Sequence, residues 1–202
     1  DVYKRQALLQ FDSDAADRVM ETEHRVNAME IEIDRELSSI IARRQPTARD
    51  LRLLIAISKT TANLERVGDE ANKIARMVKS IIESGASRML PTTELRIAAD
   101  LASNLLRTAL DAFARLDTAA ALSILKDDDL IDKEFDGFVR KLVTYMMEDP
   151  RTISASLDLL FLAKAIERIG DHAKNIAEFI IYIVKGADVR HTSMQEIESA
   201  LQ

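Results

Sequence analysis

The stretch Glu65-Arg66-Val67-Gly68-Asp69 returns about a hundred residues later as Glu167-Arg168-Ile169-Gly170-Asp171. The similarity continues beyond both stretches, because Ala71 and Ala173 stand at matching positions. Self-similarity at a fixed spacing predicts two copies of one structural unit. Each copy also carries a pair of carboxylates four residues apart, and residues at that spacing share one face of an α-helix.

Both stretches lie in segments whose apolar residues recur every three or four positions, the pattern of a helix with one buried stripe. The stripes comprise Leu64, Val67, Ala71, Ile74, Val78 and Ile81 in the first copy, and Ile166, Ile169, Ala173, Ile176, Ile180 and Ile183 in the second. Pro46, Pro91 and Pro150 mark helix starts, and Asp117-Thr118 is a further capping signal. We therefore predict helices at about 14–44, 48–83, 92–116, 118–148 and 152–186, with a short stub before residue 12. No segment alternates with period two, so the predicted fold class is all-α.

The composition excludes several classes of protein. The chain of 202 residues has five glycines, three prolines and 4% aromatic residues, which favours helices, and its length allows a sizeable core. A net charge of −6 and a pI near 5.2 argue against general nucleic-acid binding. The absence of cysteine excludes disulfides, thiolate metal sites and cysteine nucleophiles. The longest apolar run, at residues 179–184, is far shorter than the roughly 20 residues of a membrane span.

The two halves align at an offset of 102 to 105 residues, which pairs Pro46 with Pro150 and Asp12 with Asp117. We predict a helix–helix–helix unit and two tandem antiparallel three-helix bundles. Residues 1–6 look like translated adapter sequence, and residues 7–88 form the first repeat, without most of its first helix. Residues 89–186 form the second repeat, and residues 187–202 form a C-terminal tail. The truncation is expected to expose apolar surface on the first bundle.

Helical phase places the paired acids about 150–190° from the apolar stripe, on the outer face of each helix. Counting back from the proline turns brings a second polar pair on the preceding, antiparallel helix to the same level. Each repeat is thus expected to present two polar pairs across one surface groove. The eight candidate metal ligands are Glu23, Asn27, Glu65 and Asp69 in the first repeat, and Asp128, Asp132, Glu167 and Asp171 in the second.

Carboxylates four residues apart destabilise a helix, and a bound cation would relieve that repulsion. Oxygen ligands suit hard ions such as iron(III), manganese(II), magnesium(II) or calcium(II). One such pair alone is ordinary solvated surface, but its recurrence with a partner pair in both repeats favours a metal site. Asn27 is a neutral ligand, so the second copy is the firmer prediction.

Other signals are weaker. Glu21 and His24 fit half of a di-iron motif, but no second copy exists. His172 is either solvated surface or an accessory ligand. The cluster Arg43, Arg44, Arg49 and Arg52 either compensates a helix C-terminus or contacts an acidic partner. The sequence has no glycine-rich phosphate loop and no nucleophile–base arrangement, so we predict that the protein is not an enzyme.

These motifs resemble the PhoU family, the phosphate-signalling regulators of bacteria, from about residue 7 to residue 186. The resemblance rests on both Glu-Arg-x-Gly-Asp stretches and on Arg43-Arg44-Gln45-Pro46, Asp50-Leu51-Arg52 and Thr144-Tyr145-Met146-Met147-Glu148-Asp149-Pro150. It implies two tandem three-helix bundles that hold multinuclear metal clusters on the acidic pairs. Iron is the expected metal, with manganese, zinc or magnesium as alternatives.

The resemblance also implies a non-enzymatic negative regulator of phosphate uptake and of the phosphate-starvation response. Such a protein is cytoplasmic and docks peripherally at the inner face of the membrane. Its expected partners are the phosphate ABC transporter, a phosphate-sensing histidine kinase and a second copy of itself. Two alternatives remain: a carboxylate-bridged metalloenzyme, which requires inward acids and duplicated Glu-x-x-His, and a helical scaffold without metal.

Overall fold

The structure is a computed structural model that describes residues 13–83 and 92–201, except the side chains of residues 128, 129, 200 and 201. Its helices are α2 (Ser13–Arg44), α3 (Ala48–Glu83), α4 (Thr93–Arg115), α5 (Thr118–Glu148), the 3-10 turn η2 (Pro150–Thr152), α6 (Ile153–Lys185) and α7 (Met194–Leu201). The described part contains no strand, so the predicted all-α class is confirmed. The predicted stub and the proposed adapter fall outside the described residues.

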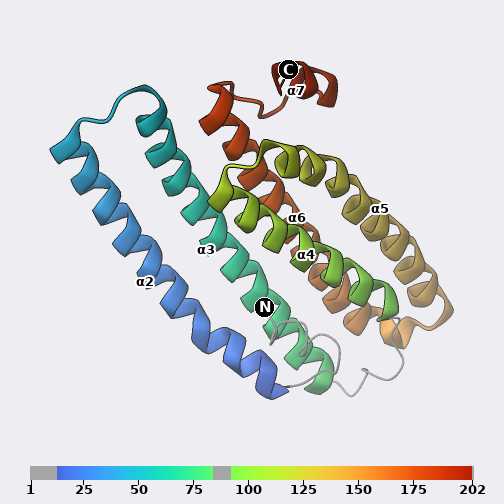
Figure 1. Cartoon of the computed structure of the whole chain (residues 1–202). Helices are drawn as coiled ribbons and strands as arrows, with labels where there is room; N and C mark the ends of the chain where they lie inside the picture. Colours follow the sequence, from blue (N-terminus) through green and yellow to red (C-terminus); the bar gives the residue numbers. More distant parts are fainter. Residues whose placement is uncertain (1–12, 84–91, 202) are drawn as a thin grey trace.

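The helices form two adjoining units that follow the sequence repeat (Figure 1). The first unit is the antiparallel pair α2–α3, and the second is the bundle α4–α5–α6. Helix α6 packs against α3, α4 and α5, which makes it the central helix of the molecule. Within the described ranges, no helix is long and apolar enough to cross a membrane.

The buried stripes follow the predicted periodicity. On α6 all six predicted positions are buried, and Ile176, Ile180 and Ile183 are fully inaccessible. On α3 only Leu64, the first position of its stripe, is half-buried rather than buried. The two helices run antiparallel to each other, because Ser80 near the end of α3 bonds Asp158 near the start of α6 at 2.9 Å. The two sequence repeats therefore meet along an α3–α6 seam.

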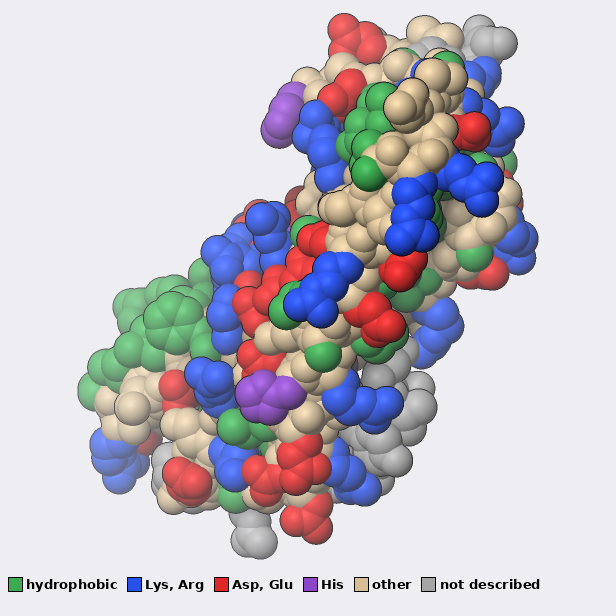
Figure 2. Space-filling model, turned by 90° about the vertical axis from the view of Figure 1, so that its left-hand side faces the viewer, with side chains coloured by type: hydrophobic (Ala, Val, Ile, Leu, Met, Phe, Trp, Pro, Cys, Tyr) green, Lys and Arg blue, Asp and Glu red, His purple; other side chains and the backbone are tan. Residues whose placement is uncertain are grey.

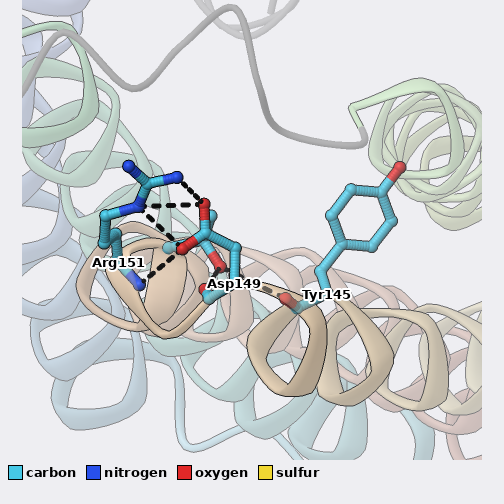
Figure 3. A network of polar contacts seen from close by, with 4 residues as sticks. Tyr145, Asp149 and Arg151 are labelled. Atoms are coloured by element: carbon cyan, nitrogen blue, oxygen red, sulfur yellow. Dashed lines mark hydrogen bonds and ion pairs between the residues drawn. The ribbon is translucent and has the colours of Figure 1, made fainter.

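Local chemistry sets the helix ends. Asp117 caps α5 as predicted, and its carboxylate accepts the backbone N–H groups of Ala119 and Ala120, each at 3.0 Å. Asp149 makes the turn into α6: its own N–H bonds the Tyr145 carbonyl, and its side chain accepts from the Arg151 backbone at 3.0 Å (Figure 3). The Arg151 guanidinium also bonds Asp149 at 2.9 Å and lowers the pKa of that carboxyl.

Helix α2 and the C-terminal tail each show one further feature. Helix α2 exposes Met29, Ile31, Ile40 and Ile41. The C-terminal tail contains α7, a helix that the sequence did not predict. Helix α7 packs lightly against α6 through the buried Ile197.

Candidate metal centres and the groove between the repeats

The first acidic pair lies where α2 and α3 pack closely. A side chain at Gly68 would stand 3.6 Å from Val26 Cγ1, so this glycine allows an ordinary close contact between the two helices. Glu23 of α2 accepts a hydrogen bond from the Asn72 amide of α3. Asn27 lies half-buried one turn further along α2. The structure therefore places Glu23 across from the α3 face that carries Glu65 and Asp69, as predicted.

The electrostatics of Glu65 identify a wider acidic cluster. Burial raises the pKa of Glu65, and the charges of Asp69, Glu30 and Glu23 raise it further, against an opposing effect of Arg66. The carboxylates of Glu23, Glu30 and Asp69 thus all act on Glu65, from both α2 and α3. Sequence reasoning missed Glu30, although its position two helical turns after Glu23 places it near the same face.

The second copy is arranged differently. The Glu167 side chain is only 13% exposed; its Oε1 pairs with Lys164 at 2.6 Å, while its buried Oε2 has no hydrogen-bond partner in the described part. Glu167 lines a small cavity together with Glu94 and Glu134. Glu134 follows Glu30 by 104 residues, so each repeat carries an extra glutamate near its motif glutamate.

The prediction that Glu167 lies on an outer face, away from any buried cavity, was wrong. Helical phase measures direction relative to the helix's own apolar stripe, and α6 has neighbours on three sides. At Glu167 residues of α4 and α5 surround the side chain, Glu94 and Glu134 among them. Asp132 is exposed on α5, whereas the Asp128 side chain lies outside the described residues.

The aspartates of the two motifs line one groove between α3 and α6, with a volume of about 980 Å³. Asp69 and Asp171 both face it, and each is half-buried. The sequence predicted two separate sites because helical periodicity carries no information on how the repeats pack against each other. The structure instead brings both motifs to a common seam.

A polar network crosses this seam. Asn63 Nδ2 donates to the Lys59 carbonyl at 2.8 Å, and Asn63 Oδ1 accepts from Asn175 Nδ2 at 3.1 Å. His172 Nδ1 lies 2.9 Å from the same oxygen and therefore donates to it. Burial lowers the pKa of His172, and the charge of Arg66 lowers it further. His172 is thus half-buried and bonded across the seam, and the solvated interpretation was wrong.

The basic cluster at the α2–α3 turn divides in two. Arg43, Arg44 and Arg49 are exposed, and the first two occupy the last turn of α2, where cations offset the helix dipole. Arg52 is half-buried, and its guanidinium lies against Gly186, 3.3 Å from where a side chain there would begin. Arg52 therefore has a packing role at the end of α6.

The chemistry of the acidic positions fits a hard cation, although their present arrangement does not yet enclose one. Among the described side chains, no three carboxylates or imidazoles converge closely enough to hold a metal ion, and Asp128 is outside that set. The donors are nevertheless oxygen atoms, the type that iron(III), manganese and magnesium prefer. The raised pKa of Glu65 and the unpartnered Glu167 Oε2 are both features that a nearby cation would relieve.

Comparison with known proteins agrees with the repeat. The PhoU domain matches residues 5–78 and again residues 95–180. The PhoU homolog of the phosphate-specific transport system from Burkholderia sp is 54% identical over 192 residues, covering 95% of this chain and 82% of that protein. The phosphate-specific transport system accessory protein PhoU of Escherichia coli K12 is 48% identical over 191 residues, covering 94% of this chain and 78% of that one.

Two solved structures have the same architecture. The crystal structure of PhoU from Pseudomonas aeruginosa superposes with a TM-score of 0.88 at 46% identity, covering 92% of this chain and 88% of that chain. The phosphate transport system regulatory protein PhoU from Streptococcus pneumoniae superposes with a TM-score of 0.85 at 26% identity, covering 93% and 87%.

Proposed function

The chain belongs to the PhoU family, and on that premise we propose that it is a non-enzymatic negative regulator of phosphate uptake and of phosphate-starvation signalling. The observation that carries the proposal is the Glu-Arg-x-Gly-Asp stretch on α3 and again on α6, in a chain 54% identical to a phosphate transport accessory protein. The likeness spans both repeats, which supports a shared role for the whole described fold rather than for one helix.

The proposed partners are the phosphate ABC transporter and a phosphate-sensing histidine kinase. The transporter is supported by the relatives' names, since they are accessory proteins of the phosphate-specific transport system. The kinase, and assembly of two copies into a homodimer, are proposed from the family resemblance. In this scheme the protein acts in the cytoplasm and associates peripherally with the inner face of the membrane through its partners.

We further propose that the acidic positions bind a multinuclear metal cluster, with iron as the first candidate and manganese, zinc or magnesium as alternatives. Glu23, Glu65 and Asp69 would hold ions at the first repeat, with Asn27 as a neutral ligand. Glu167 and Asp171 would do so at the second, together with Asp128 and Asp132. Bound cations would supply the positive charge that offsets the repulsion within these carboxylate groups.

A gene-level experiment tests the regulatory role. Deletion of the gene should switch on a phosphate-starvation reporter at high phosphate, and a plasmid copy should restore repression. A reporter that stays silent after deletion would contradict the regulator proposal. Restoration by a copy carrying Asp69→Ala and Asp171→Ala would show that repression does not need these carboxylates.

Metal analysis tests the proposed ligands separately. Protein purified without chelator should carry metal, and the Asp69→Ala/Asp171→Ala variant should lose most of it. Asp111→Ala is the matched control, because Asp111 is an exposed aspartate on α4, a helix that carries none of the proposed ligands. Equal metal content in all three proteins would refute the ligand assignment while leaving the reporter result untouched.

A further inference from the structure

The groove between α3 and α6 has a charge opposite to that of the chain. Six lysines and arginines line it against four aspartates and glutamates, whereas the whole chain carries −6. Figure 2 shows Lys and Arg side chains gathered along the left-hand edge of the face that it presents, where the surface is hollowed. The residues that line the groove explain why it is positive although the protein as a whole is acidic.

Two cations contact one buried carboxylate in the groove, and a third cation lines the groove with them. Lys73 Nζ lies 2.8 Å from Glu70 Oε1, and Arg168 Nη1 lies 3.1 Å from the same oxygen. Arg66 lines the groove beside them and forms no ion pair within the described part of the chain. Glu70 is buried and its one negative charge is shared by two partners. Counting Asp69, Asp171 and Glu178 as well, the groove as a whole keeps two more cations than carboxylates.

The repeat explains where the excess comes from. Arg66 and Arg168 are equivalent positions, and the equivalent of Glu70 is His172. Arg168 of the second repeat pairs with Glu70 of the first, so a symmetric seam would pair Arg66 with a glutamate at position 172. The sequence has histidine there, and its Nδ1 is committed to Asn63. Arg66 therefore has no counterpart of the buried Glu70 that pairs with Arg168.

We propose that this groove is a binding site for a compact phosphate-type oxyanion. Arg66 and Arg168 supply planar guanidinium groups, which match tetrahedral oxyanions in bidentate fashion, and Lys73 adds a point charge. The acids along the groove, Asp69 and Asp171 among them, would repel a long acidic segment of a partner. A small anion needs to approach only the central cations. The site shares its groove with the proposed cation ligands Asp69 and Asp171 but uses different side chains, and it does not depend on the regulatory role.

Calorimetric titration of the chelator-treated full chain with inorganic phosphate tests the site, at constant ionic strength because salt screens such contacts. We expect saturable binding that Arg66→Gln weakens by about tenfold or more, the usual scale for loss of a charge-assisted hydrogen bond. Arg76→Gln is the matched control, an exposed arginine on the same helix that does not line the groove, and it should bind like wild type.

Two further measurements identify the anion and allow for a variant that does not fold. Tighter binding of pyrophosphate than of phosphate would assign the site to the phosphoryl group of a larger ligand, and the reverse order would assign it to free phosphate. If Arg66→Gln fails to fold, Arg66→Lys keeps the charge but loses the bidentate geometry, and it should weaken binding by a smaller factor. No saturable binding of either anion, or equal binding by the Arg66 and Arg76 variants, would overturn the proposal.

Discussion

Among single residues, Glu178 is a buried acid that lines the groove. It is 9% exposed, and burial raises the pKa of its carboxyl despite the opposing charges of Lys174, His191 and Arg190. An acid whose pKa is higher in the folded state binds its proton more tightly there, so acidification favours folding. Above the raised pKa the buried carboxylate is charged and reduces stability.

Glu178→Gln should therefore stabilise the protein at neutral pH. We expect the melting temperature at pH 7 to rise by about 2 °C, the shift that roughly 0.5–1 kcal/mol produces in a chain of this size. The difference from wild type should shrink as pH falls through the raised pKa of Glu178, because the native side chain then becomes neutral as well. Glu148→Gln, at an exposed position, is the control. A lower melting temperature for Glu178→Gln at pH 7 would contradict the assignment.

Asn63 is the residue on which the seam's hydrogen bonds converge. Its 7% exposed side chain bonds the Lys59 carbonyl, His172 and Asn175. Asn63→Ala leaves these groups without their partner in a half-buried place, so we expect a loss of about 1–3 kcal/mol in the free energy of unfolding. Urea denaturation measures it, with the exposed Asn104→Ala as the comparison. Equal midpoints for the two variants would show that the network adds nothing to stability.

At the scale of helices, the sequence predicted most of what the structure has, because long amphipathic segments carry a periodic signal. The bounds 14–44, 48–83, 118–148 and 152–186 lie within a residue or two of α2, α3, α5 and α6. Helix α7 was missed because eight residues are too few to show that period. The environment of Glu167 was missed for another reason: phase gives the direction of a side chain but not the number of helices that surround it.

Gly137 inside α5 and Gly186 at the end of α6 differ in backbone conformation. Gly186 ends α6 with φ of 75°, in the left-handed region, and the Arg52 guanidinium covers it. Gly186→Ala should cost about 1 kcal/mol through backbone strain, besides moving Arg52. Gly137 lies exposed inside α5, and a Cβ added there would meet no atom of another part of the chain within 4 Å. Gly137→Ala should therefore add about 0.5–1 kcal/mol through helix propensity. Thermal melts measure the change in melting temperature of both variants, which should fall for Gly186→Ala and rise for Gly137→Ala. Shifts of the same sign would refute the different roles assigned to the two glycines.

At the scale of the whole molecule, the two repeats contribute unequally to the core. Helix α2 buries only Ala15, Ala16, Val19 and Leu37, whereas α6 is buried along most of its length. Helix α3 obtains much of its burial from α6 rather than from α2, through contacts such as Ala56 against Phe179 and Ile183. Stability of the α2–α3 pair should therefore depend on the seam that also forms the groove. The sequence could predict two repeats. It could not predict that the first repeat is stabilised by packing against the second, because the packing of the two units leaves no periodic signal.

Phe179→Ala tests this dependence. Phe179 is 6% exposed in the small cluster that joins α3 to α6, and the Lys59 ammonium stands 5.7 Å from its ring centre. Removal of its ring should lower the free energy of unfolding by about 3–5 kcal/mol, and most of this destabilisation should affect the α3–α6 seam. Hydrogen exchange in increasing urea should show residues 48–83 losing protection before residues 118–148, because α5 keeps its contacts with α4 and α6. Phe161→Ala, on the same helix but 56% exposed, should leave both regions nearly unchanged. Simultaneous loss of protection in the two regions of Phe179→Ala would mean that the repeats unfold as one unit and that the seam is no weaker than the bundle.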